Sequence, residues 1–526
     1  MRADGECASV RFLPAGTRAE VAPGSTVLAA AAAAGMVLPA PCGGRGACGR
    51  CAVKVIEGAL EPPEDRELSA LARARADASL VRLACMARVA PGEVTVRPLA
   101  AAAAVATAGE VGSAPRLVAG VDLGTTSVAA QLIDASRRTL IGSVRIPNRQ
   151  ASFGGDVLSR ISAALGGEHE HLMAAAEDSI LDALSKAGAG PSVAASTLER
   201  IVVAGNTAMT SLLLGADVSG LASHPFSHAL DGLDRITDTG LAARLGGVEI
   251  RMVPPVTAFV GGDLVAGVIA AGLADDSADA LLIDLGTNAE VAAVTGGKVV
   301  VASAPAGPAF EGWGIACGGQ AGPGGIVRIA PGGSIVGLRA ITDEGPPSHL
   351  TGSGLISAIA YLRRAGHLDA DGLLRPEGPC SERFFTAGGV LAVSLGTDPL
   401  DRRVFLSQLD VRALQSAKAA VCVAVKAVVR AAGANSVRDA VVTGAFGGAL
   451  ETGDLVELGI VPTEAGGALR YLPEAALQGA AAMALEPGLF EDAQAFVSRA
   501  EHLDLAVGES FTSEFVAALR LEAFSL

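Results

Sequence analysis

Four cysteines near the start of the chain constrain its fold more than any other feature. Three share one glycine-rich segment with the spacing C-x5-C-x2-C and the fourth follows later; they are Cys42, Cys48, Cys51 and Cys85. A [2Fe–2S] cluster takes four thiolates, and three from one loop with one from a distant strand supply them. The intervening glycines permit the unusual backbone angles that such a loop needs. The spacing therefore predicts a [2Fe–2S] site.

A structural zinc site is the alternative interpretation of four thiolates. Zinc sites of this kind usually show two separate C-x2-C pairs, whereas only Cys48 and Cys51 have that spacing among the four. The remaining cysteines are scattered singly, as in proteins of a reducing compartment. The cluster is the favoured interpretation.

Composition and charge narrow the function classes. A chain of 526 residues is longer than one hydrophobic core usually covers, so several domains are expected. Its most apolar stretch, residues 27–41, is alanine-rich and shorter than the roughly 20 residues of a membrane span. No signal peptide is recognisable. The net charge of −15 and the lack of a basic run argue against nucleic-acid binding. We expect a cytoplasmic protein that binds neither membrane nor nucleic acid.

Residues 1–97 form the first predicted domain, a small β-rich unit. Short strands are expected at 10–13, 18–21, 52–56, 81–83 and 93–96, with helices from Ser25 or Thr26 to 35 and over 64–75. This order of elements around the cysteine loop resembles the β-grasp [2Fe–2S] ferredoxins, which implies an α+β fold. The alanine-rich residues 98–115 show no amphipathic period and predict a linker.

Beyond the linker, strands alternate with helices, which predicts an α/β architecture. Two predicted apolar strands each end in a D-x-G-T motif. The first motif begins at Asp122 and the second at Asp284. The glycine turn lets backbone N–H groups approach phosphate oxygens, and the aspartate can hold Mg²⁺ or orient an attacking water. We expect Asp122 and Asp284 to be catalytic. The phosphate-binding residues expected at the two turns are Gly124, Thr125, Thr126, Gly286, Thr287 and Asn288.

A third strand runs into a glycine-rich turn that permits close approach of an adenosine. Its predicted binding residues are Gly444, Ala445, Phe446 and Gly447. The three motifs resemble the phosphate-1, phosphate-2 and adenosine motifs of the actin, Hsp70 and sugar-kinase superfamily. The resemblance implies two α/β lobes of RNase-H-like fold that close on ATP and Mg²⁺. We expect the first lobe at 116–275 and the second, with the adenosine motif, at 276–526.

Further motifs narrow the resemblance; they lie at 148–157, 204–209, 261–263, 305–312 and 414–418. Together with the ferredoxin domain they resemble the reductive activators of corrinoid enzymes. The resemblance implies an ATP-driven one-electron reduction of a Co(II) corrinoid to Co(I), with the cluster as electron carrier. It implies an electron donor, a homodimer and a corrinoid-binding partner, either a methyltransferase corrinoid protein or a cobalamin-dependent methionine synthase. It also adds Gly307 to the nucleotide-binding residues.

Several residues carry two interpretations. Glu290 is expected as a third catalytic carboxylate, with a strand-edge acid as the alternative. Asp156 and Asp263 follow glycines and suit ligand contacts or helix caps. Lys418 suits a solvated helix face better than a nucleotide contact. Thr351 stands where the family pattern has a cysteine, which leaves the role of that loop open.

Two other functions fit the same motifs. A small-molecule kinase with an accessory redox domain would phosphorylate an added substrate without any corrinoid. A chaperone-like ATPase with a redox-sensing ferredoxin would keep its function after loss of a cluster ligand. The related activators of 2-hydroxyacyl-CoA dehydratases use a [4Fe–4S] cluster between subunits, and the separate C-x5-C-x2-C domain argues against that class.

Overall fold

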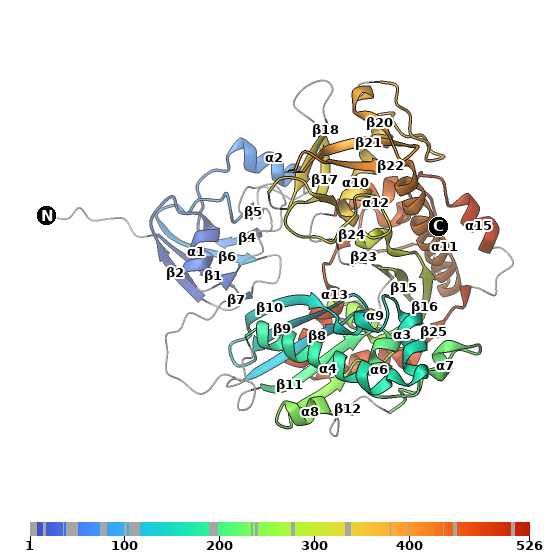
Figure 1. Cartoon of the computed structure of the whole chain (residues 1–526). Coiled ribbons are helices and arrows are strands. Elements are labelled where there is room, and N and C mark those ends of the chain that lie inside the picture. Colours follow the sequence, from blue (N-terminus) through green and yellow to red (C-terminus); the bar gives the residue numbers. More distant parts are fainter. Residues whose placement is uncertain are drawn as a thin grey trace. The chain divides into compact units, whose positions relative to one another are not determined.

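The computed structural model divides into two compact units, Met1–Leu117 with Leu132–Ser143 and Val118–Gln131 with Val144–Leu526 (Figure 1). The structure describes residues 8–13, 17–34, 36–37, 51–73, 81–98, 103–104, 116–188, 198–232, 235–236, 240–274, 279–331, 338–343, 345–378, 380–398, 400–434, 436–444, 446, 450–505 and 511–526.

The first unit contains a five-stranded sheet with the order β2-β1-β6-β4-β5. Its strands are β1 (Ala8–Phe12), β2 (Thr17–Val21), β4 (Ala52–Glu57), β5 (Val81–Leu83) and β6 (Gly92–Pro98). Strand β1 runs antiparallel to β2 and parallel to β6, and helix α1 (Val27–Ala33) packs on β1 and β2. This is the predicted β-grasp arrangement.

Side-chain contacts explain the two helices of this unit. The hydroxyl of Thr26 accepts a hydrogen bond from the N–H of Ala29 at 3.1 Å, so Thr26 caps α1. Helix α2 (Asp65–Arg73) is attached to β5 by Glu67 and Arg82, which form two hydrogen bonds of 2.9 Å while both are buried. A bidentate pair of this kind fixes geometry, so it positions the strand that leads to Cys85.

Most of the predicted linker at 98–115 lies outside the described residues. Within it, Ala103–Ala104 form the short strand β7, which pairs with β3 (Met36–Val37).

A first six-stranded sheet with the order β10-β9-β8-β11-β13-β12 follows, and most of its residues belong to the second unit, whereas residues 132–143 of β9, β10 and their turn are grouped with the first. Its strands are β8 (Leu117–Leu123), β9 (Ser127–Asp134), β10 (Thr139–Pro147), β11 (Leu198–Gly205), β12 (Arg235–Ile236) and β13 (Glu249–Met252). The accompanying helices are η1 (Arg149–Ser152), α3 (Val157–Ala163), η2 (Ala164–Glu168), α4 (His169–Lys186), α6 (Thr207–Leu213), α7 (Ser219–Ala222), α8 (Gly240–Arg244) and α9 (Gly262–Ala271).

The second sheet has the order β24-β23-β14-β15-β16-β25. Its strands are β14 (Ala280–Leu285), β15 (Asn288–Thr295), β16 (Lys298–Pro305), β23 (Asp439–Thr443), β24 (Leu469–Tyr471) and β25 (Ala500–His502). Both sheets share a five-strand order, β10-β9-β8-β11-β13 and β16-β15-β14-β23-β24, in which three consecutive strands lie beside two later ones. The sixth strand, β12 or β25, lies at opposite ends of the two sheets. The repeated order confirms the predicted pair of α/β lobes.

The second half also carries two small sheets. They consist of β17 (Gly325–Pro331), β18 (Leu338–Thr342) and β19 (His349–Leu350), and of β20 (Phe384–Ala387), β21 (Val390–Thr397) and β22 (Arg403–Ser407). Its remaining helices are η3 (Pro308–Glu311), α10 (Gly352–Arg364), η4 (Ser381–Arg383), α11 (Gln408–Ala432), α12 (Thr452–Glu457), η5 (Thr463–Ala465), α13 (Ala475–Leu485), α14 (Gly488–Arg499) and α15 (Phe511–Ala517).

Helix α11 has a defined cap at each end. Ser407 and Asp410 form a capping box at its start, and Gly433 ends it with a φ of 75°. The helix packs against β15 and β16 and buries an apolar stripe in the core of the second lobe. None of the helices in the described ranges has the length and apolar character that a membrane crossing requires.

Helix α13 returns from the C-terminal half to the first sheet, where it packs against α9 and β11 (Figure 1). Small residues allow this close approach: Gly479 lies against the backbone of Ala266, and Gly120 lies against the backbone of Ala481. The chain after 276 therefore supplies helix α13 to the layer around the first sheet.

Candidate functional site

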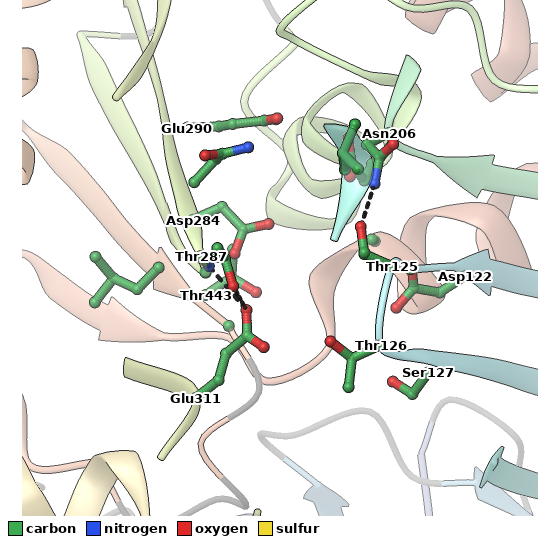
Figure 2. Close-up of a pocket in the computed structure, with 18 of the residues that line it drawn as sticks. Asp122, Thr125, Thr126, Ser127, Asn206, Asp284, Thr287, Glu290, Glu311 and Thr443 are labelled. Carbon is green, nitrogen blue, oxygen red and sulfur yellow. Dashed lines mark hydrogen bonds between the residues drawn. The ribbon is translucent and has the colours of Figure 1, made fainter. Parts of the chain in front are cut away.

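The two D-x-G-T turns face the same cleft, which has a volume of about 440 Å³ (Figure 2). Asp122 and Asp284 both line it, from the ends of β8 and β14. The starts of α9 and α13 and the turn after β23 also contribute to its walls. The structure thus brings together the two motifs that the sequence predicts as halves of one site.

The predicted phosphate residues Gly124, Thr125 and Thr126 line the cleft. The N–H of Gly124 donates to the carbonyl of Ser127 at 3.0 Å and closes the turn. Two asparagines from the other family motifs hold it in place. Asn148 donates to the carbonyl of Gly124 at 2.9 Å, and Asn206 donates to the hydroxyl of Thr125 at 3.1 Å.

The second turn brings Gly286, Thr287 and Asn288 to the cleft. Antiparallel pairing of β14 with β15 sets Asp284 opposite Glu290. The N–H and the hydroxyl of Thr287 both donate to one carboxylate oxygen of Glu311, at 2.8 and 2.9 Å. The donors of this turn are therefore engaged by an acidic side chain from η3.

Many acidic residues line the cleft, among them Asp122, Asp263, Asp284 and Glu290. Burial, with the like charge of Asp122, raises the pKa of Asp263 to about 7. Burial, with Asp263, Asp122 and Glu311, raises the pKa of Asp284 to about 7. Burial also raises the pKa of Glu290 well above its usual value. Like charges held close in a partly dry site favour protonation or a bound cation.

Glu290 stands out among these carboxylates. Its side chain is 7% exposed, and its Oε2 atom has no hydrogen-bond partner. A buried acceptor without a partner is costly in a folded protein. The orphaned oxygen, at the wall of the cleft, is available to a ligand, a water or a cation.

Arg145 supplies positive charge beside the first aspartate. Its guanidinium lies 3.5 Å from Asp122, 2.9 Å from Glu474 and 2.7 Å from the hydroxyl of Ser127. Burial nevertheless dominates over Arg145, so the pKa of Asp122 is raised. The sequence analysis missed Arg145 and Glu474. Arg145 is one of the alternating exposed residues of β10, so in the sequence it looks like an ordinary surface residue.

The acidic residues of the cleft have the chemistry to share a Mg²⁺ ion with phosphates. Among the described residues, no three His, Cys, Asp or Glu side chains converge into a self-sufficient metal site. Mg²⁺ commonly takes one or two carboxylates and completes its shell with phosphates and water. Asp122 and Asp284, one from each lobe, have the chemistry for that arrangement.

The adenosine motif is only partly described. Thr443 and Gly444 line the cleft, and Gly444 receives a 3.0 Å hydrogen bond on its carbonyl from the hydroxyl of Tyr471. Phe446 is 1% exposed and packs edge-on against Phe310, so it contributes to the core and does not line the cleft. The predicted Ala445 and Gly447 lie outside the described residues.

Gly307 does not line the cleft either. Its N–H donates to the carbonyl of Thr287 at 2.8 Å, so it supports the second turn from behind. Asp156 caps α3 through Ser159 and also lines the cleft. Asp263 lies in the first turn of α9 and lines the cleft.

Two motif residues have structural roles. Thr351 caps α10, donating to the carbonyl of Ile326 at 2.8 Å and accepting from Gly354 at 3.1 Å. The interpretation of Lys418 as a solvated residue is wrong. It is 2% exposed and its ammonium donates to the carbonyl of Arg520 at 2.6 Å, while burial lowers its pKa to about 8.

In the first unit, the sulfur atoms of Cys51 and Cys85 lie 3.3 Å apart, and both side chains are buried. The hydrogen bond between them lowers the pKa of Cys51 to about 7. A thiolate is the form that binds iron. The two adjacent sulfurs fit neighbouring ligands of one metal centre. The other two predicted ligands, Cys42 and Cys48, lie outside the described residues.

Fold and site together define an ATPase of the actin, Hsp70 and sugar-kinase type joined to a ferredoxin. Residues 11–90 match the 2Fe-2S iron-sulfur cluster binding domain. Residues 117–276 match the RACo middle region, and 278–525 match the C-terminal domain of RACo, the ASKHA domain. The chain belongs to the RACo family, the reductive activators of corrinoid enzymes.

Two named relatives are similar to this chain in sequence. The chain is 29% identical over 420 residues to the corrinoid activation enzyme RamQ of Eubacterium limosum, covering 75% of this chain and 68% of RamQ. It is 25% identical over 285 residues to the [Co(II) methylated amine-specific corrinoid protein] reductase of Methanosarcina barkeri. That match covers 47% of this chain and 51% of the reductase, about half of each.

A solved structure shares the fold over nearly the whole chain. It is the reductive activator for a corrinoid, iron-sulfur protein, with a TM-score of 0.71, 23% identity and 98% of both chains covered.

Proposed function

We propose that this chain uses ATP to drive the one-electron reduction of a Co(II) corrinoid, held by a partner protein, to Co(I). One observation carries the proposal. A single chain joins a paired-thiol ferredoxin unit to a cleft in which two D-x-G-T turns face each other. The printed names of both relatives, a corrinoid activation enzyme and a Co(II) corrinoid protein reductase, support it.

The electron-carrying part of the proposal rests on the first unit. Cys42, Cys48, Cys51 and Cys85 would hold the [2Fe–2S] cluster, which when bound supplies a one-electron carrier. The buried pair Cys51 and Cys85 keeps two sulfurs together and dry. An external electron donor is required.

The cleft supplies the nucleotide chemistry. Gly124, Thr125 and Thr126 would donate to one part of the triphosphate, and Gly286, Thr287 and Asn288 to the other. Asp122 and Asp284 would hold Mg²⁺ or its waters, because they reach the cleft from opposite lobes.

Glu290 would accept the proton of the attacking water through its unpartnered Oε2. A cation bound beside Asp284 would lower the pKa of Glu290 toward the working range, since a nearby positive charge favours the carboxylate. Gly307, Gly444, Ala445, Phe446 and Gly447 complete the proposed nucleotide region, with Gly307 and Phe446 acting behind the surface.

ATP is needed because the electron transfer runs uphill. One electron against a gap of about 200 mV costs about 5 kcal/mol, which an iron–sulfur cluster cannot supply by itself. ATP binding and hydrolysis can shift populations among complexes with the corrinoid partner, and so favour transfer. Opening and closing of the two lobes is the proposed means.

The remaining assignments follow the same proposal. The partner is a methyltransferase corrinoid protein or a cobalamin-dependent methionine synthase, and the active form is a homodimer in the cytoplasm. The proposed division is 1–97 for the ferredoxin domain, 98–115 for the linker, and 116–275 and 276–526 for the lobes.

The test is anaerobic reduction of a Co(II) corrinoid protein by this chain and a reduced donor, with and without MgATP. Formation of Co(I) only with MgATP supports the proposal. A phosphorylated small molecule with no corrinoid dependence would favour a kinase, and partner remodelling by a Cys85→Ser variant would favour a chaperone.

A further inference from the structure

Glu311 engages the donors that the second phosphate turn offers. One oxygen of its carboxylate accepts both the N–H and the hydroxyl of Thr287, at 2.8 and 2.9 Å (Figure 2). Two donors converging on one anionic oxygen is the arrangement by which such turns hold phosphate oxygens. The carboxylate thus takes the place that the proposed function gives to a phosphate.

Glu311 and a nucleotide cannot use these donors at the same time. Each hydrogen of Thr287 makes one strong bond, and bonds to an ionised acceptor are worth about 1.5–3 kcal/mol. Glu311 also adds negative charge beside Asp284, where it helps to raise the pKa of that carboxyl. A triphosphate entering the cleft meets both a competitor and a repulsive charge.

The backbone that carries Glu311 is held by its neighbours in the core. Phe310, the preceding residue, is 1% exposed and packs against Phe446 with ring centroids 6.3 Å apart. Gly352, the first residue of α10, lies directly against the Phe310 carbonyl. Rotation of the Glu311 side chain would free Thr287 without moving η3 out of the core.

We propose that Glu311 is a built-in competitor for the nucleotide phosphates at Thr287. The carboxylate holds the second turn in shape, and it swings away when a triphosphate takes its donors. This inference rests on the proposed function, because it requires that ATP binds in this cleft. Its consequence is that Glu311 weakens ATP binding and speeds nucleotide release from the cleft.

The test compares MgATP binding to the wild-type chain, Glu311→Gln and Glu311→Ala by titration calorimetry. Loss of the competitor is expected to tighten MgATP binding about tenfold in Glu311→Ala, the equivalent of about 1.4 kcal/mol. Glu311→Gln keeps the shape but not the charge, and is expected to lie between the two. Glu382→Gln, an exposed residue outside the cleft, controls for loss of one negative charge.

A second readout follows the side chain itself. Trp313, the one tryptophan of the chain, lies close to Glu311 in sequence and is 45% exposed. Its emission is expected to change when MgATP displaces the Glu311 carboxylate, and that change is expected to shrink in Glu311→Ala.

The outcomes are distinguishable. Unchanged or weaker MgATP binding in both Glu311 variants, with normal binding by the wild type, would overturn the competitor role and leave the proposed function standing. Absence of MgATP binding by the wild-type chain would overturn the proposed function, and the competitor role with it.

Discussion

At the scale of single residues, the cleft gathers carboxylates that a protein selected for stability alone would separate. Asp263 is a clear case, because burial and Asp122 raise its pKa to about 7. Above that pH the folded chain holds an unfavourable charge that the unfolded chain solvates freely. The arrangement is explicable if a cation with bound phosphates balances it.

Replacing the Asp263 carboxylate is expected to raise the free energy of unfolding and to lower the ATPase activity. Asp263→Asn is expected to raise the free energy of unfolding by about 1 kcal/mol at pH 8 in magnesium-free buffer. The gain should be clearly smaller at pH 5, because the cost of this carboxyl builds up as the pH rises from its unfolded pKa of 3.8 to its raised pKa of about 7. MgATP hydrolysis should fall. Urea unfolding at both pH values is the measurement, with Asp231→Asn, an exposed residue, as control. Lower stability of Asp263→Asn at pH 8 would contradict this account.

The sequence analysis singled out Asp122 and Asp284, which line the cleft, because the residues of each D-x-G-T turn are adjacent in the sequence. Asp122 and Asp284 follow apolar strands and precede glycine turns, which is a local pattern. Arg145 and the bonds of Glu311 depend on which segments meet in space. No local sequence pattern indicates contacts between distant segments, so only the structure shows them.

At the scale of elements, the lobes are joined by helices that pack without side chains between them. Gly479 of α13 lies against the backbone of Ala266 in α9, so any Cβ there would overlap a carbonyl. Gly479→Ala is therefore expected to lower the free energy of unfolding by about 2–3 kcal/mol.

Chemical denaturation measures that loss. Gly453→Ala, a helical glycine in α12 with open space around it, is the matched control. It is expected to be neutral or to stabilise by up to about 1 kcal/mol, since alanine is the better helix former. Equal effects of the two substitutions would show that the close contact of α13 with α9 is unimportant.

Lys418 of α11 donates a hydrogen bond to the C-terminal segment, and its burial makes the free energy of unfolding depend on pH. Its pKa falls from 10.5 to about 8 because burial disfavours the charge. Between those pH values the unfolded chain holds the proton and the folded chain does not, so folding stability rises with pH. Lys418→Met should lack this rise.

Urea unfolding at pH 7.5 and 9.5 tests the signature. The wild type should gain stability relative to Lys418→Met at the higher pH, while Lys298→Met, an exposed residue, keeps the wild-type trend. Parallel pH profiles for wild type and Lys418→Met would refute the assignment.

Cap residues at the ends of a helix are local in sequence, whereas the environment of a helix face is not. Ser407, Asp410 and Gly433 mark α11 by cap chemistry alone. Lys418 was misjudged because its burial comes from the C-terminal segment, which is distant in sequence and reaches α11 only in the folded protein.

At the scale of the whole molecule, two units with separate cores carry two separate chemistries. The two lobes of the ATPase share a five-strand order, and each brings the aspartate of one D-x-G-T turn to the cleft. The ferredoxin unit buries its own sheet around Cys51 and Cys85. We expect each chemistry to be removable without the other.

Cys85→Ser should therefore abolish the visible absorbance of the [2Fe–2S] cluster while leaving MgATP hydrolysis intact. Absorbance after anaerobic reconstitution and phosphate release measure the two properties. Asp284→Asn is the reciprocal variant, and it should keep the cluster while losing hydrolysis by about a hundredfold or more. Loss of ATPase activity in Cys85→Ser would show that the two chemistries are not independent.

The most direct measurement of the central claim is the absorbance of Co(I) formed on a Co(II) corrinoid protein under anaerobic conditions, using the wild type, Cys85→Ser and Asp284→Asn. The account predicts Co(I) only with the wild type, a reduced donor and MgATP together. Co(I) formation by Asp284→Asn, or by the wild type without MgATP, would contradict the claim that this cleft drives the reduction.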